Sequence, residues 1–147
     1  MVQDASAVGI SVRLIASITY PAGIQLNAFP EDGETGPNGE NEIAGNASGV
    51  NGDLIVWKTV SGIEYTLNLI PNTEQEALVD VLFEGNRASK NRFPKKDIIT
   101  LIVTDPVTGV PKTYKNGVIK NGAVGYRYGG DGRIRNKSYG FVFEDAV

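Results

Sequence analysis

Residues 10–29 read ISVRLIASITYPAGIQLNAF, and apolar and polar side chains alternate along both halves of this stretch. A period of two is typical of a β-strand with one buried face. Pro21 and Gly23 stand between the halves and predict a turn. The stretch therefore predicts a hairpin, whose first strand has one apolar face made of Ile10, Val12, Leu14, Ala16, Ile18 and Tyr20.

Later segments also predict strands. Residues 53–60 and 63–70 flank the turn residues Ser61 and Gly62, which predicts a second hairpin. Residues 98–104, IITLIVT, are apolar on both faces and predict a strand covered on both sides. The C-terminal part adds turn signals at Asn116-Gly117 and Asn121-Gly122 and a last strand at 133–144, which begins basic and ends aromatic in the core.

One helix is predicted over residues 73–86. Thr73 and Glu76 have the spacing of a capping box. A stripe at one-turn spacing follows, made of Ala77, Leu78, Val81 and Leu82. Together these elements predict a mainly β single domain over residues 1–147. We expect an antiparallel β-sandwich or barrel of about seven to nine strands, with one flanking α-helix (about 73–86), a long acidic loop (30–46) and residues 1–9 as an N-terminal arm.

Composition excludes several kinds of chemistry. The chain has 147 residues, 41% of them apolar and 21% charged, as is usual for one folded domain, and its 18 glycines favour many turns. It contains no cysteine or histidine, which excludes disulfides, thiolate nucleophiles, zinc-finger sites and histidine acid–base catalysis. No apolar stretch approaches the ~20 residues of a membrane span, and Asp4 does not suit a signal peptide. We expect a soluble protein made in the cytoplasm.

No motif singles out an active site or a cofactor. Residues 117–122, GVIKNG, have the glycine spacing of a P-loop, but Ala123 and Val124 replace its Lys-Ser/Thr pair. No pair of carboxylates stands out, so we expect neither an enzyme nor a cofactor. The acidic loop could offer oxygens to calcium, but the sixth position from Asp32 is Pro37 rather than the EF-hand glycine, and a solvated loop is the favoured interpretation.

Charge divides the chain. Residues 1–86 carry two basic and twelve acidic side chains, a net charge of −10, whereas residues 87–147 carry twelve basic and five acidic ones, a net charge of +7. This division could mark a nucleic-acid-binding half, or complementary surfaces of copies that join head to tail, or two halves that mix on one surface. The candidate assembly residues are Glu31, Asp32, Glu34, Glu40 and Glu42 in the acidic loop and Arg87, Lys90, Arg92, Lys95 and Lys96 in the basic segment.

Aromatic residues beside basic ones leave two further alternatives. Arg127, Arg133 and Arg135 with nearby tyrosines could bind single-stranded nucleic acid, although arginine and tyrosine are also enriched at protein interfaces, which we favour. Trp57 and Tyr128 could stack on a sugar in a carbohydrate-binding β-sandwich, but the strand around Trp57 predicts a core position.

Several phrases resemble a known family: VNGDLIVWK at 50–58, VLFEGNR at 81–87, NGVIKNG at 116–122 and GRIRNKSYGFVFE at 132–144. Over residues 8–145 the chain resembles the small tail tube proteins of contractile-tailed bacteriophages, whose fold is shared with secretion-system tube proteins. The resemblance implies a non-enzymatic structural subunit that forms stacked hexameric rings, a DNA conduit inside a contractile sheath. Residues 30–46 and 1–9 fit the loop and terminal arm through which such rings stack.

The resemblance also implies partners and a location. The partners would be other copies of the chain, the tail sheath protein, baseplate and tail-terminator proteins, and phage DNA that passes through the lumen without specific binding. The location would be the virion tail, with assembly in the host cytoplasm. A baseplate or tail-terminal ring protein of the same fold is the alternative. We further expect the acidic loop of one ring to meet residues 87–96 of the next.

Overall fold

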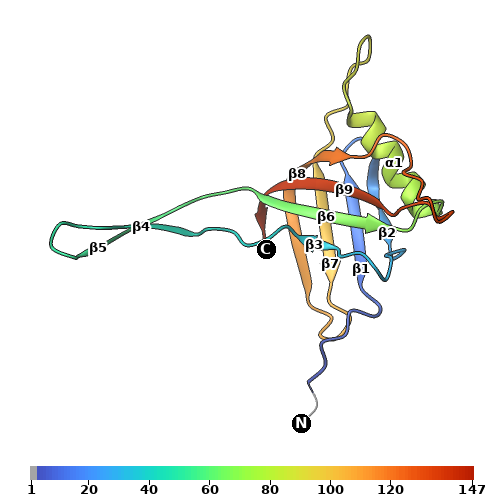
Figure 1. Ribbon diagram of the computed structural model, residues 1–147. Helices are drawn as coiled ribbons and strands as arrows, with labels where there is room; N and C mark the ends of the chain where they lie inside the picture. The colour runs from blue at the N-terminus through green and yellow to red at the C-terminus, as the bar shows by residue number, and fades with distance from the viewer. Residues whose placement is uncertain (1–2) are drawn as a thin grey trace.

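Nine strands and one helix make up the regular structure of residues 3–147, the part of the chain that the computed structural model describes (Figure 1). Seven strands form one antiparallel sheet in the order β2-β1-β7-β8-β9-β6-β3, and β4 and β5 form a separate pair. The elements are β1 Ser11–Ala16, β2 Tyr20–Leu26, β3 Gly36–Pro37, β4 Ala44–Ser48, β5 Leu54–Lys58, β6 Ile63–Leu69, α1 Glu74–Asn86, β7 Ile99–Thr104, β8 Pro111–Gly122 and β9 Lys137–Ala146.

The predicted fold class is confirmed: the chain is mainly β and antiparallel, with one helix. Within residues 3–147 the sheet does not close into a barrel, because β2 and β3 remain at its two ends. Of the predicted N-terminal arm, residues 1–2 lie outside the described part of the chain. Across residues 3–147, no helix has the length and apolar character that crossing a membrane requires.

The core lies between one face of the large sheet and α1. The first predicted hairpin is confirmed as β1 and β2, but its turn lies at residues 17–19, and the predicted turn residues Pro21 and Gly23 are part of β2. The central residues of its apolar face, Val12, Leu14 and Ala16, are fully buried. Ile18 at the end of that face is exposed because it lies in the turn before β2. Aromatic side chains from β6, β8 and β9 fill the centre: Tyr65, Tyr114, Tyr139, Phe141 and Phe143.

The second predicted hairpin is wrong, because β5 pairs with β4 and not with β6. Residues 49–53 close the β4–β5 turn, in which the Gly49 N–H donates to the Asp53 carbonyl at 2.7 Å. β6 instead pairs with β9 from Ile63 to Leu69, and this pairing buries its apolar face in the core. Residues 30–46, predicted to lack strands, contain β3 and the start of β4.

The helix is confirmed, but its buried face differs from the predicted stripe. Thr73 caps α1 by accepting a hydrogen bond from the Glu76 N–H at 3.2 Å. The buried side chains are Glu76, Val79, Leu82 and Phe83. Ala77 and Val81 are exposed, and the buried face of the helix carries Glu76 instead, whose carboxylate accepts hydrogen bonds from Tyr126 and Tyr139.

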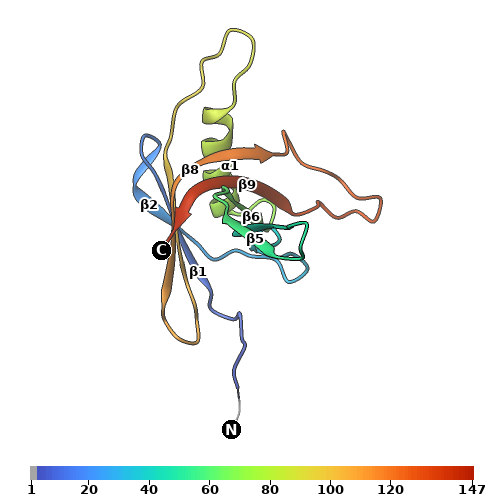
Figure 2. The ribbon, with the colours of Figure 1, turned by 90° about the vertical axis from the view of Figure 1, so that its left-hand side faces the viewer.

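Two other predictions need correction. Asn116-Gly117 and Asn121-Gly122 are not turns but lie within β8, where the pairing register shifts between Ile119 and Asn121. A second irregularity lies in the β7–β8 pairing, opposite the stretch between Ile99 and Leu101, and Asn116 accommodates it with a φ of 54°. β7 is fully buried on one face only: Ile99 and Leu101 point into the core, whereas Thr100 and Ile102 on the other face are partly exposed, and α1 packs on one side of the sheet (Figure 2).

Candidate functional site

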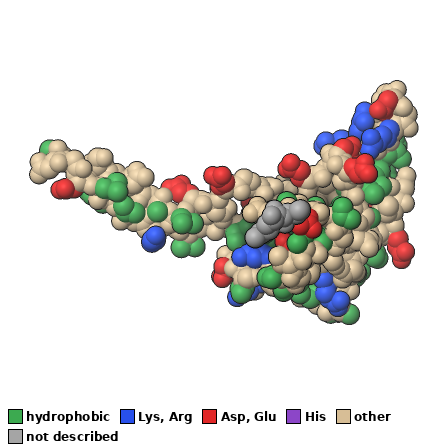
Figure 3. All heavy atoms as spheres, turned by 90° about the horizontal axis from the view of Figure 1, so that it is seen from below, with side chains coloured by type: hydrophobic (Ala, Val, Ile, Leu, Met, Phe, Trp, Pro, Cys, Tyr) green, Lys and Arg blue, Asp and Glu red, His purple; other side chains and the backbone are tan. Residues whose placement is uncertain are grey.

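A long hairpin projects from the body of the molecule and is its most conspicuous feature (Figure 1). We call residues 43–60, which contain β4 and β5, the hairpin arm. Its strands carry apolar side chains on both faces: Leu54 and Val56 on one, Ile55 and Trp57 on the other. All four are exposed, and apolar groups are visible along the arm in Figure 3. A two-stranded hairpin is marginally stable alone in water, and an exposed apolar surface of this kind is typical of a site of contact with another molecule.

The prediction that Trp57 lies in the core is wrong, because this residue is on the hairpin arm. Its ring lies directly over Gly45 on the paired strand, where a Cβ atom would come within 2.7 Å of the ring carbon Cζ2. The indole remains 49% exposed. The glycine therefore allows a flat aromatic surface on one face of the arm.

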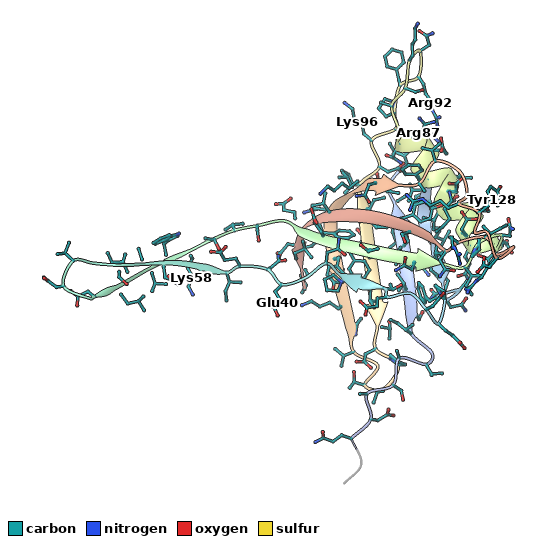
Figure 4. All side chains as sticks on the ribbon, in the orientation of Figure 1. Glu40, Lys58, Arg87, Arg92, Lys96 and Tyr128 are labelled. Atoms are coloured by element: carbon teal, nitrogen blue, oxygen red, sulfur yellow. The ribbon has the colours of Figure 1, made fainter. Side chains whose placement is uncertain are left out.

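A second projection extends beyond the C-terminal end of α1 (Figures 1 and 4). We call residues 87–96 the basic loop. Arg87 and Arg92 both pair with the Glu84 carboxylate, at 3.1 and 3.3 Å. The Arg92 guanidinium also donates to the Glu84 carbonyl, and the Lys95 N–H donates to the Gly85 carbonyl at 2.8 Å. These donors satisfy the last carbonyls of the helix and hold the loop against it.

A buried carboxylate fixes the far end of the basic loop. Asp97 is 2% exposed and accepts hydrogen bonds from the backbone of Ile18 and Thr19, both at 2.8 Å. It also exchanges hydrogen bonds with the Asn86 side chain. Burial by itself raises the pKa of Asp97, but the hydrogen bonds from Asn86 and Thr19 outweigh it and hold the pKa below its usual value.

The acidic loop divides into two parts. Asp32 pairs with Arg133 at 3.3 Å and accepts from Asn136 at 2.8 Å. The Asn136 hydrogen bond, with the charge of Arg133, lowers the pKa of Asp32. Glu40 lies instead near the root of the hairpin arm (Figure 4), and the Glu42 carbonyl there accepts a hydrogen bond from the Thr59 hydroxyl at 2.9 Å.

No ion pair joins the acidic loop to the basic loop within residues 3–147. Three of the ten candidate assembly residues, Asp32, Arg87 and Arg92, are used in ion pairs elsewhere within the chain. The other seven make no ion pair with any described residue: Glu31, Glu34, Glu40, Glu42, Lys90, Lys95 and Lys96. Pairing between copies stays a prediction for these seven.

The geometry gives little support to the other binding alternatives. Arg133 and Arg135 are engaged by Asp32 and Asp131, which reduces the charge they could offer to phosphates. Tyr128 lies on the opposite side of the molecule from the hairpin arm that carries Trp57, so the two do not form one platform (Figure 4). Among residues 3–147, no three Asp or Glu side chains gather as metal ligands would.

A buried polar network beneath α1 was missed by sequence reasoning. Lys137 is 3% exposed and donates to the Asp80 carboxylate and the Ala123 carbonyl, both at 3.1 Å. Glu76 accepts from Tyr126 at 2.6 Å and from Tyr139 at 3.0 Å. Burial and the neighbouring carboxylates raise the pKa of Tyr139. The available signal was that Lys137 shares the apolar face of β9 and must therefore point inward.

Comparison with known proteins identifies the family. A family model described as tail fiber protein gp32 matches residues 3–147. The chain belongs to this family. None of the curated proteins matches it.

Two solved structures share the fold of this family member. A chain in the cryo-EM structure of the anti-feeding prophage baseplate has a TM-score of 0.52 at 9% identity, over 100% of this chain and 96% of that one. A chain in the structure of the PVC sheath/tube terminator of an extracellular contractile injection system has a TM-score of 0.53 at 10% identity, over 99% and 96%. The predicted resemblance is confirmed at the level of a tail protein with the fold found in contractile injection systems.

Proposed function

We propose that the protein is a structural subunit of a contractile phage tail that assembles with its own copies into hexameric rings, stacked as the tail tube through which DNA passes. The observation that carries the proposal is the hairpin arm. It exposes apolar side chains on both faces and has no core of its own. Exposure of these apolar side chains to water is unfavourable in a free monomer, and their burial against another chain would stabilise an assembly.

The size of the arm suits contact with a neighbouring copy. From its root to its turn it has about nine residues a strand, which at ~3.3 Å per residue corresponds to a reach of roughly 30 Å. Complete burial of a side chain such as Leu54 or Ile55 contributes about 1.5–3 kcal/mol, and half of that when the side chain is half exposed at the start. The arm therefore offers several kcal/mol to an interface.

The same surfaces suit the other proposed partners. The tail sheath protein would cover the outside of the rings, and baseplate and tail-terminator proteins would bind the two ends of the tube. DNA would pass without specific contacts, which agrees with the engagement of Arg133 and Arg135 by acidic side chains. A subunit of this kind needs no catalytic group.

A second candidate function is a single ring at one end of the tube. Both structural neighbours favour it, since one structure is of a baseplate and the other is of a sheath/tube terminator. Such a ring would use the hairpin arm in the same way but would not stack on copies of itself.

Negative-stain electron microscopy of the purified chain across a concentration series tests the proposal. We expect hollow tubes of constant width; isolated rings would favour the second candidate. The triple variant Leu54→Ser, Val56→Ser, Trp57→Ser should abolish assembly, whereas the control Val124→Ser, at an exposed site on the body, should not. A chain that stays monomeric at every concentration and gives no cross-linked oligomers would refute self-assembly.

A further inference from the structure

The basic loop carries an exposed apolar side chain close to its tip, and several of its lysines form no ion pair within the described chain. Phe93 is 96% exposed. Lys90, Lys95 and Lys96 are exposed as well and form no ion pair within the described chain. An aromatic ring surrounded by charges of one sign suits an apolar pocket with a rim of the opposite sign.

The basic loop is held in a defined shape. The Arg92 N–H donates to the Ser89 carbonyl at 3.0 Å, and Asn91 takes the left-handed conformation that this turn needs, with a φ of 63°. Arg92 and Lys95 fasten the two sides of the loop to the end of α1. A projection ordered in advance loses little conformational entropy when it docks.

A hollow with the complementary character lies beside the N-terminal segment. It has a volume of about 760 Å³ and is lined by residues 7–10 together with Phe29, Pro30 and Glu31. Binding pockets for small molecules are of order 300–1,000 Å³, so a phenyl ring fits. Glu34 lines an adjoining hollow that shares Ala7 with the first. Neither Glu31 nor Glu34 has an ion-pair partner among residues 3–147.

The basic loop and this hollow are at opposite ends of the molecule. The N-terminal segment lies at the bottom of both ribbon views and residues 87–96 at the top (Figures 1 and 2). The loop of one chain therefore cannot fill its own hollow. A contact between two unlike ends joins copies head to tail and remains open for further growth.

We propose that the basic loop of one copy docks into the hollow of the next copy along the stack, with Phe93 in its apolar part and Lys95 and Lys96 beside Glu31 and Glu34. This inference rests on the proposed function, because it supplies the contact between stacked rings. The opposite charges of the two surfaces favour a second copy as the occupant.

Paired cysteines test the contact directly, since the chain has no cysteine of its own. Ala88 lies across from Phe93 in the basic loop, because Ser89 bridges Arg92, and Val8 lines the hollow. A chain with Ala88→Cys and Val8→Cys, treated with a short bis-maleimide, should give a ladder of covalent multimers. Each single-cysteine variant should give no ladder and no dimer; dimers from a single variant would indicate a symmetric contact and overturn the proposal.

Charge reversal provides the second measurement. Lys95→Glu with Lys96→Glu should raise the concentration needed for assembly roughly threefold to tenfold, as expected for two ion pairs at an exposed rim. Glu31→Lys with Glu34→Lys should do the same, and the four changes together should restore assembly. The control Lys112→Glu with Lys115→Glu changes net charge equally and should have little effect.

The outcomes separate this inference from the proposed function. Rings or tubes in the microscope without a ladder would overturn the docking and leave the proposed function standing. No assembly and no ladder at any concentration would overturn both. If the Lys95/Lys96 variant and the Glu31/Glu34 variant each still gave a ladder and assembled at an unchanged concentration, the role of the carboxylates would be overturned.

Discussion

Replacement of Lys137 by methionine should destabilise the domain strongly, although the two side chains have similar volumes. The ammonium group is 3% exposed and lies 3.1 Å from the Asp80 carboxylate and 3.9 Å from the Glu76 carboxylate. Methionine fills much of the same space but leaves Glu76, 1% exposed, with two tyrosine donors and no nearby cation.

The magnitude follows from the two carboxylates. Removal of one partner from a buried ion pair costs about 3–5 kcal/mol. Asp80 is 38% exposed and can be hydrated after the change, so we expect the lower end, about 3 kcal/mol. For a domain of this size each kcal/mol lowers Tm by roughly 2–4 °C, so Tm should fall by roughly 6–12 °C.

Urea unfolding followed by circular dichroism measures the effect. Lys137→Met combined with Glu76→Gln should recover about half of the loss, because the amide oxygen still accepts from Tyr139 while the unpaired buried charge is gone. Lys112→Met, at an exposed lysine on β8, is the matched control and should change stability by less than about 0.5 kcal/mol. A Lys137→Met protein within 1 kcal/mol of the wild type would refute this account of the network.

Two further predictions concern packing and pH. Gly117→Ala should cost about 1–3 kcal/mol, because its Cβ would overlap Phe143 and come within 2.8 Å of the Val142 carbonyl oxygen, whereas Gly36→Ala has open space and should be near neutral; equal urea midpoints for the two variants would contradict this. Because the pKa of Asp97 is lowered by folding, its stabilising contribution is present above about pH 4 and lost as pH falls through the folded pKa. Asp97→Asn should therefore be less stable at pH 7 and lose less on acidification than the wild type; parallel curves from pH 7 to pH 3 would contradict it.

Local patterns predicted the elements better than the contacts between them. Alternation in residues 10–29 identified the two strands of the first hairpin but not the position of its turn, and the capping box at Thr73 identified the helix correctly. Pairing of residues 63–70 was mistaken because a turn signal at Ser61-Gly62 is local, whereas the β6–β9 pairing joins residues that are 68 to 80 positions apart, from Leu69 with Lys137 to Ile63 with Phe143. Distant partners of this kind leave no mark in a single sequence.

Only part of the candidate site could be predicted, because charge counting locates charged segments but not their partners. Charge counting found the acidic and basic segments, but it could not show that Asp32 and Arg92 are already engaged within the chain. Trp57 was assigned to a strand correctly and to the core wrongly, because the sequence of an apolar strand does not show whether the strand is buried in its own domain or exposed on an arm. The buried Lys137 was hidden by the usual preference of lysine for the surface.

The hairpin arm also has a consequence for measurement. Its ten paired residues are held by one short ladder of backbone hydrogen bonds with solvent on both sides. Local opening there costs little free energy, so in a free chain its amide protons should exchange with deuterium far sooner than those of β6 and β9. Burial in an interface would slow that exchange. Deuterium uptake between Ala44 and Lys58 would then report, residue by residue and without a label, what fraction of the protein is free.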